Sequence, residues 1–126
     1  MHKVILSCFL CIVSLVAATE LYVDALAGAE GAPYSCSFLK PCKSINDAIW
    51  AAQPFDTIVL NSTAAQKHTW DGRFLSKPLN FTGSPSFEMS GNSKVATMVI
   101  PFRSYAIDIA ASVTITFVNI NFEIFD

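Results

Sequence analysis

Residues 113–122, VTITFVNINF, carry the pattern that decides the expected fold. Apolar and polar residues alternate up to Phe117, and the alternation restarts out of phase at Val118. In one straight strand this shift would put half of the apolar side chains on the opposite face. A bend between Phe117 and Val118 keeps both sets on one side, as at the corners of a coiled parallel sheet. A long hairpin strand with one bulge is the alternative, although the stretch holds no Asn-Gly or Asp-Gly turn signal.

Upstream of this stretch, several runs are rich in apolar and β-branched residues. The continuous run at residues 57–60 is typical of a strand buried in a parallel sheet. No helical pattern separates the later runs, so we expect no βαβ crossover among them. Ile58, Leu79 and Val99 lie about twenty residues apart, which predicts solenoid coils of that period. The other strand runs are residues 21–23, 79–81, 97–100 and 106–109.

One helix is expected, over residues 44–53. Ser44 is a favourable N-cap, and Asp47 occupies the capping-box position three residues later. Ile45 and Ile49 lie on the same apolar face of this helix. Because the first coil of a solenoid would otherwise expose an apolar end, the sequence predicts that the helix covers that end with Ile45 and Ile49 inward.

The N-terminal residues indicate the secretory pathway. Residues 4–18 are almost wholly apolar and follow a short positive start. The run matches the core of a signal peptide and is shorter than the roughly 20 residues that span a bilayer, although a short anchor or a buried helix is the alternative. Small residues at 16–18 predict cleavage before Thr19. We therefore expect an extracellular or cell-surface mature chain with no membrane span.

The remaining cysteines and two sequons fit an oxidising compartment. Cys36 and Cys42 follow the signal peptide and are predicted to form a disulfide; two separate thiols or a metal site are the alternatives. A zinc site would need two further ligands, and His68 is the only histidine after the signal peptide. Asn61 and Asn80 begin Asn-X-Ser/Thr motifs and are predicted N-glycosylation sites.

The charged residues form no recognisable catalytic or metal-binding pattern. A glycosidase needs two carboxyls that face one bond, and no DxD, DD or ExxH pattern is present. Asp47 fits a helix cap, Asp71 fits a turn before Gly72, and Asp108 is expected to face outward from a strand. We therefore expect no catalytic residue, cofactor or metal. The formal net charge of −2 also gives no basic footprint for nucleic acid.

Two residues between the expected coils are candidates for glycan contact. His68 and Trp70 lie in the segment KHTW, residues 67–70. An exposed indole beside polar groups can stack on a sugar ring, whereas a tryptophan near a turn more often covers the core. Both interpretations remain open at the level of the sequence.

Four segments resemble the start of the pectin-lyase-like right-handed parallel β-helix superfamily. They are LYVD at 21–24, KPCKSINDAI at 40–49, AQPFDTIVL at 52–60 and KPLNFTG at 77–83. The resemblance implies a mainly β fold, a right-handed parallel β-helix with one N-terminal capping helix and about three to four coils. Phe55 departs from the pattern, since a glycine usually precedes the Asp there, and a wider turn is expected.

Together these observations divide the chain into a signal peptide at residues 1–18, a strand, disulfide loop and capping helix at 19–56, and incomplete β-helix coils at 57–126. The strand pattern runs to Asp126 without a cap, so we expect a fragment of a longer protein, or coverage of the last coil by oligomerisation or downstream coils.

Two functions remain open for this arrangement. The first is a non-catalytic extracellular or cell-surface scaffold that binds glycans or surface proteins. The second, implied by the lyases and hydrolases of the superfamily, is the N-terminal part of a polysaccharide-cleaving enzyme whose active site lies beyond Asp126. We expect no enzymatic activity in this chain itself.

Overall fold

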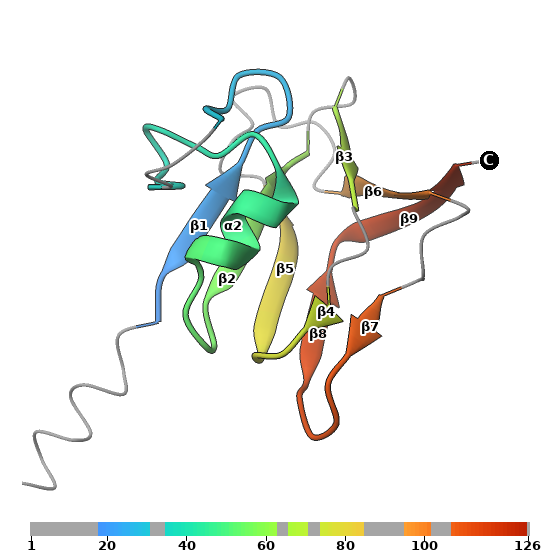
Figure 1. Ribbon diagram of the computed structural model, residues 1–126. Helices are drawn as coiled ribbons and strands as arrows, with labels where there is room; N and C mark the ends of the chain where they lie inside the picture. The colour runs from blue at the N-terminus through green and yellow to red at the C-terminus, as the bar shows by residue number, and fades with distance from the viewer. Residues whose placement is uncertain are drawn as a thin grey trace, which may run out of the picture.

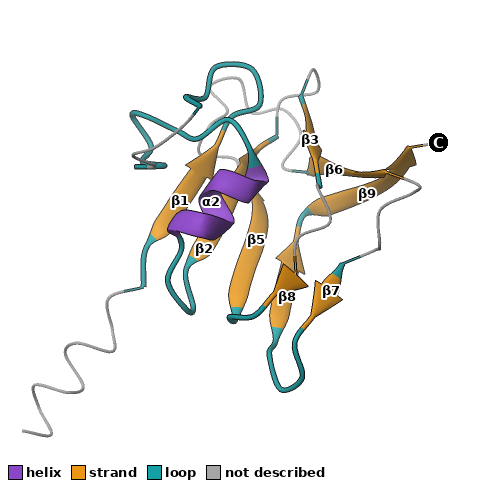
Figure 2. Cartoon of the chain, viewed as in Figure 1, coloured by secondary structure: helices purple, strands orange, loops and turns teal. Residues whose placement is uncertain are grey.

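The computed structural model describes residues 18–30, 35–62, 66–70, 74–84, 95–101 and 107–125. This part of the chain is mainly β with one helix, as predicted (Figures 1 and 2). Its elements are β1 (Glu20–Val23), α2 (Ile45–Ala51), β2 (Thr57–Asn61), β3 (Lys67–Thr69), β4 (Phe74–Leu75), β5 (Leu79–Ser84), β6 (Ala96–Pro101), β7 (Asp108–Ile109), β8 (Ile115–Val118) and β9 (Ile120–Phe125). Nearly all of the expected signal peptide, and the Asp71 turn, lie outside the described residues.

Every pairing between these strands is parallel. Strands β1, β2, β5 and β8 form one sheet in that order, β3, β6 and β9 form a second, and β4 and β7 form a third. The chain visits the three sheets in turn with β2, β3 and β4, and it repeats the same order with β5, β6 and β7. Helix α2 lies in the chain between β1 and β2, which pair in parallel. From β2 onward, no helix is present among the described residues.

The strand register corrects the predicted period of about twenty residues. In the first sheet Ile58 lies opposite Phe81, and Phe81 lies opposite Phe117. Val99 belongs to β6 in the second sheet, so it is not stacked on Leu79 of β5. The prediction was wrong because the loops between strands differ in length, and equal spacing therefore does not mark equivalent positions.

The core lies between the sheets and is built from stacked inward side chains. The rings of Phe81 and Phe117 stack with centroids 5.3 Å apart and planes at 15°. Trp70 meets Phe81 edge to face at 6.3 Å, and Phe122 meets Phe117 in the same way at 5.1 Å. Aromatic pairs in these geometries contribute about 0.5–1.5 kcal/mol beyond the burial of their area.

The predicted helix is present and lies beside β1 and β2. The Ser44 hydroxyl accepts a hydrogen bond from the backbone N–H of Asp47 at 3.1 Å, which satisfies one donor of the first turn. Ile45 and Ile49 are buried, and α2 packs against β1 and β2 (Figure 1). The helix ends at Ala51 because the next residue, Ala52, has an extended backbone.

Two turns differ in detail from the expectation. Phe55 has a φ of 71°, in the left-handed region that glycine favours, and the N–H of Asp56 donates to the Gln53 carbonyl at 3.1 Å. The turn is therefore tight, and the wider turn expected from the missing glycine is wrong. The bend expected between Phe117 and Val118 lies at Asn119, whose φ is 56°, a conformation that Asn tolerates well.

At the end opposite α2, strands β7, β8 and β9 each have one neighbouring strand among the described residues. Several apolar side chains near this end are exposed, including Val118, Phe122 and Ile124. Within the described ranges, no helix has the length and apolar character needed to cross a bilayer.

Candidate functional site

The predicted disulfide between Cys36 and Cys42 is confirmed, with the two Cα atoms 4.6 Å apart. It closes a loop that is hydrogen-bonded to β1. The N–H of Tyr22 donates to the Cys36 carbonyl at 2.7 Å, and the N–H of Cys42 donates to the Tyr22 carbonyl at 2.9 Å. The disulfide therefore holds the segment that leads into α2 against the first strand.

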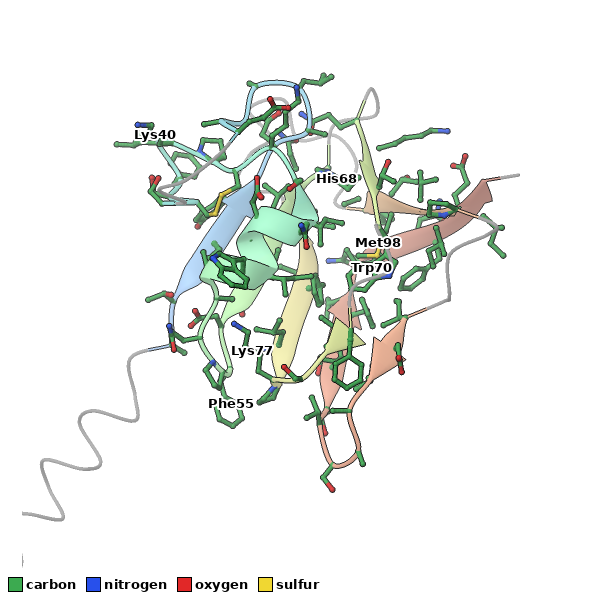
Figure 3. All side chains as sticks on the ribbon, viewed as in Figure 1. Lys40, Phe55, His68, Trp70, Lys77 and Met98 are labelled. Carbon is green, nitrogen blue, oxygen red and sulfur yellow. A yellow bond between two sulfur atoms is a disulfide. The ribbon has the colours of Figure 1, made fainter. Side chains whose placement is uncertain are left out.

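The candidate glycan contacts, His68 and Trp70, lie in the interior. Their side chains are 2% and 0% exposed, and Figure 3 shows them together with Met98 on the inner side of β3 and β6. Stacking on a sugar needs an accessible ring face, so the predicted role of these two residues in glycan contact is wrong. Strand alternation explains the result, since His68 points inward while Lys67 and Thr69 point outward.

A buried polar cluster surrounds Asp24, just after β1. Its Oδ1 accepts hydrogen bonds from the N–H groups of Leu26 at 3.0 Å and Ala27 at 2.8 Å, and from Nε2 of Gln66 at 2.9 Å. Its Oδ2 accepts from Nδ2 of Asn61 at 3.0 Å. Burial alone raises the pKa of Asp24, but these four donors outweigh it and hold the pKa below its usual value. The carboxylate thus joins the loop after β1 to the end of β2.

The environment of Asn61 bears on its predicted glycosylation. Its side chain is 6% exposed, and its Nδ2 donates to Asp24. A glycan attached to this nitrogen would have to pass through the packed cluster and would disturb the hydrogen bond, so the folded structure does not fit modification of Asn61. Asn80, on β5 and opposite Thr57 and Thr116, is partly exposed and remains a predicted site.

His68 adds a second titratable group beside this cluster. Its Nε2 lies 2.8 Å from the carbonyl oxygen of Asn61, which can only accept, so Nε2 carries the hydrogen. Its buried Nδ1 has no hydrogen-bond partner within the described structure. Burial lowers the pKa of His68, and the Asn61 carbonyl and the charge of Asp24 oppose that shift only in part. Burial therefore favours the neutral imidazole of His68 in the folded chain.

This geometry predicts a loss of stability in mild acid. Below about pH 6.5 the unfolded chain binds a proton at His68 that the folded chain does not, so acid favours unfolding with a slope of at most about 1.4 kcal/mol per pH unit. Urea titrations at about pH 7.5 and about pH 5.5 measure the effect. His68→Gln cannot titrate and should show a flatter profile; an unchanged pH dependence in this variant would contradict the assignment.

The other described aspartates have structural positions. Asp56 is buried, and its two carboxylate oxygens accept from the N–H groups of Thr19 and Gln53, both at 2.8 Å. Asp108 is exposed on β7, as expected from the sequence. Among the described residues, no three or more His, Cys, Asp or Glu side chains are grouped so that they could hold a metal ion.

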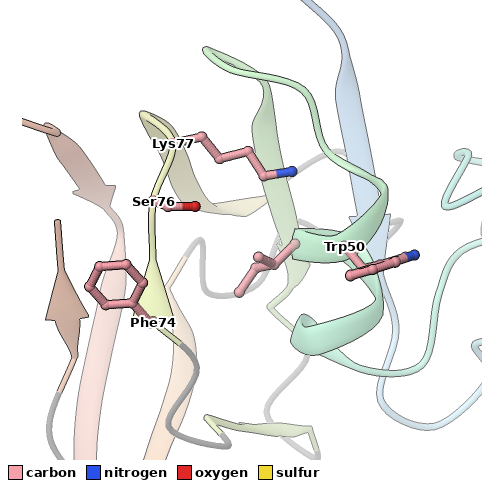
Figure 4. A pocket seen from close by; sticks show the side chains of 5 residues that line it. Trp50, Phe74, Ser76 and Lys77 are labelled. Carbon is pink, nitrogen blue, oxygen red and sulfur yellow. The ribbon is translucent and has the colours of Figure 1, made fainter.

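A groove of about 260 Å³ lies between α2 and β4 and is lined by Ile49, Trp50, Phe74, Ser76 and Lys77. Trp50 and Phe74 are 68% and 52% exposed. In Figure 4 the Phe74 ring lies beside β4, whereas the Trp50 indole extends from α2 in the direction away from Phe74. Lys77 extends toward the C-terminal end of α2, where its ammonium donates to the Ala52 carbonyl. The groove thus combines exposed aromatic surface with a hydroxyl and an ammonium donor.

Neither aromatic residue of this groove was identified from the sequence. Trp50 lies one position after Ile49 and therefore off the apolar face of α2. This position in the helix could have predicted from the sequence that Trp50 is exposed. Phe74 is exposed because the next residue, Leu75, occupies the inward position of β4. Comparison of the chain with protein-family models, curated proteins and solved structures found no match.

Proposed function

We propose that this chain is the helix-capped start of a right-handed parallel β-helix and serves as a non-catalytic extracellular or cell-surface scaffold that binds glycans between α2 and β4. The repeated visiting order of the three parallel sheets supports the coiled architecture. The Cys36–Cys42 disulfide supports an oxidising compartment.

The observation that carries glycan binding is the pair of exposed aromatic side chains, Trp50 and Phe74, at one groove. Isolated exposed apolar residues are common on protein surfaces. Two exposed aromatic rings beside polar donors at a groove are a more specific sign of a ligand-binding site. The apolar face of a sugar ring can pack on such rings while its hydroxyls accept from Ser76 and Lys77. The volume of about 260 Å³ suits a short part of a glycan chain.

The lining of the groove supports binding without cleavage. Its described lining residues include no carboxylate, whereas glycoside hydrolysis ordinarily uses a pair of them. Asp24 and Asp56 are each occupied by hydrogen bonds that hold the fold together.

A glycan microarray with the secreted protein, followed by calorimetric titration of the best-retained oligosaccharide, tests the proposal. Trp50→Ala and Phe74→Ala should each weaken binding by about tenfold or more, because each removes a stacking surface. Both side chains are more than half exposed, so circular dichroism should show an intact fold.

Leu39→Ala provides the matched control, since Leu39 is 92% exposed but does not line the groove. It should bind as the unaltered protein does. Retention of no glycan, or affinities unchanged by both aromatic substitutions, would refute the proposed site.

A further inference from the structure

Strand β3 begins the second sheet and has a neighbour, β6, on one side only among the described residues. The N–H of Trp70 donates to the Val99 carbonyl of β6 at 2.8 Å. In a parallel ladder, alternate residues direct their backbone groups to the same neighbour. His68 and Trp70 therefore face β6, while the N–H and C=O groups of Lys67 and Thr69 point away from it.

These outward backbone groups have no strand partner among the described residues. Among the described residues, no backbone hydrogen bond links Lys67 or Thr69 to a segment on the outer side of β3. An unpaired strand edge of this kind is a template for an added strand. Proteins that recognise extended peptides use such edges, where main-chain hydrogen bonds supply affinity and neighbouring side chains supply specificity.

A cavity of about 230 Å³ lies beside β3 and provides room for such a segment. All three β3 residues line it, and the rest of its lining comes from Ala25 and residues 43–45 at the start of α2. With a rise of about 3.3 Å per residue, β3 offers about 10 Å of edge. The groove therefore accommodates a short extended stretch of peptide and is distinct from the groove between α2 and β4.

The charged groups of this groove select the partner. Lys43 and Lys67 line it, and none of its described lining residues is acidic. Both lysines have ion pairs, Lys43 with Glu30 at 3.3 Å and Lys67 with Glu123 at 2.8 Å. The ammonium of Lys67 reaches across β6 to Glu123 of β9, away from the outer edge of β3. The Lys43–Glu30 pair is solvent-exposed and contributes little, so a ligand carboxylate can replace Glu30 at Lys43. We propose that the outer edge of β3 binds an extended acidic peptide segment of a partner protein by strand addition.

Fluorescence anisotropy with the whole secreted chain tests the proposal. The probe is a fluorescein-labelled peptide of alternating Asp and Val, about eight residues long so that it extends beyond β3 at both ends. A peptide of the same length with Lys in place of Asp is the charge control. We expect saturable binding of the acidic peptide and at least about tenfold weaker binding of the basic one.

Two substitutions separate the contributions of backbone and charge. Thr69→Pro removes an N–H that points away from β6 and should lower the affinity for the acidic peptide about tenfold. Thr69→Val keeps that N–H and should bind the peptide with normal affinity. Lys43→Glu should lower the affinity for the acidic peptide about fivefold or more. Lys40→Glu makes the same charge change outside the groove and should have little effect on that affinity.

The charge pair keeps the test decisive if Thr69→Pro fails to fold. No saturable binding of the acidic peptide, equal affinity for the acidic and basic peptides, or equal effects of Lys43→Glu and Lys40→Glu would each overturn the proposal. Loss of glycan binding in Trp50→Ala with peptide binding intact would show that the two grooves act separately.

Discussion

Asp24→Ala should lower the free energy of unfolding by about 3–5 kcal/mol, because it leaves buried donors without their acceptor. The amides of Asn61 and Gln66 are 6% and 5% exposed, and both donate to the Asp24 carboxylate. The N–H groups of Leu26 and Ala27 lose the same acceptor. Urea titration followed by the fluorescence of buried Trp70 measures the change.

Asp108→Ala is the matched control, because it removes an exposed carboxylate from β7. It should change the free energy of unfolding by no more than about 0.5 kcal/mol. Folded domains are typically stable by only about 5–15 kcal/mol, so Asp24→Ala should also reduce the yield of folded protein. A loss below about 1 kcal/mol for Asp24→Ala would mean that water or a shifted loop replaces the carboxylate.

Phe81→Ala should lower the free energy of unfolding by about 3–5 kcal/mol, the range found when a buried phenylalanine is truncated. Phe81 is fully buried between Trp70 and Phe117, and it contacts both rings. Its removal takes away apolar burial and leaves a cavity where the first sheet meets the core. Thermal and urea unfolding of the variant, compared with the unaltered chain, give the change.

Phe74→Ala makes the same chemical change at a ring that is 52% exposed. It should shift the free energy of unfolding by less than about 1 kcal/mol. Equal losses in Phe74→Ala and Phe81→Ala would contradict the placement of Phe81 at the centre of the core. The pair therefore tests the burial of Phe81 between Trp70 and Phe117.

Local patterns in the sequence were sufficient to predict several elements. The Ser44 cap and the apolar face of α2 depend on contacts within about one helical turn. The run at residues 57–60 predicts a buried strand because β-branched residues suit that environment wherever the strand pairs. The Cys36–Cys42 disulfide closes a short loop, and bringing the ends of a short loop together costs little conformational entropy.

The strand register was decided by the tertiary structure alone. The spacing of Ile58, Leu79 and Val99 predicted one stack, yet Val99 lies in a different sheet from the other two. Stacking aligns strands rather than chain positions, and loops of unequal length between strands are tolerated because loop closure costs little per added residue. A constant period was therefore not required by the fold.

The roles of individual side chains were also settled only by tertiary contacts. The segment LYVD at 21–24 did not reveal the role of Asp24, because its partners Asn61 and Gln66 lie 37 and 42 residues further along the chain. His68 and Trp70 looked like surface candidates, but the pairing of β3 with β6 turns them inward. Burial depends on surfaces that meet across long sequence separations, and a local pattern cannot report which of its faces the rest of the chain will cover.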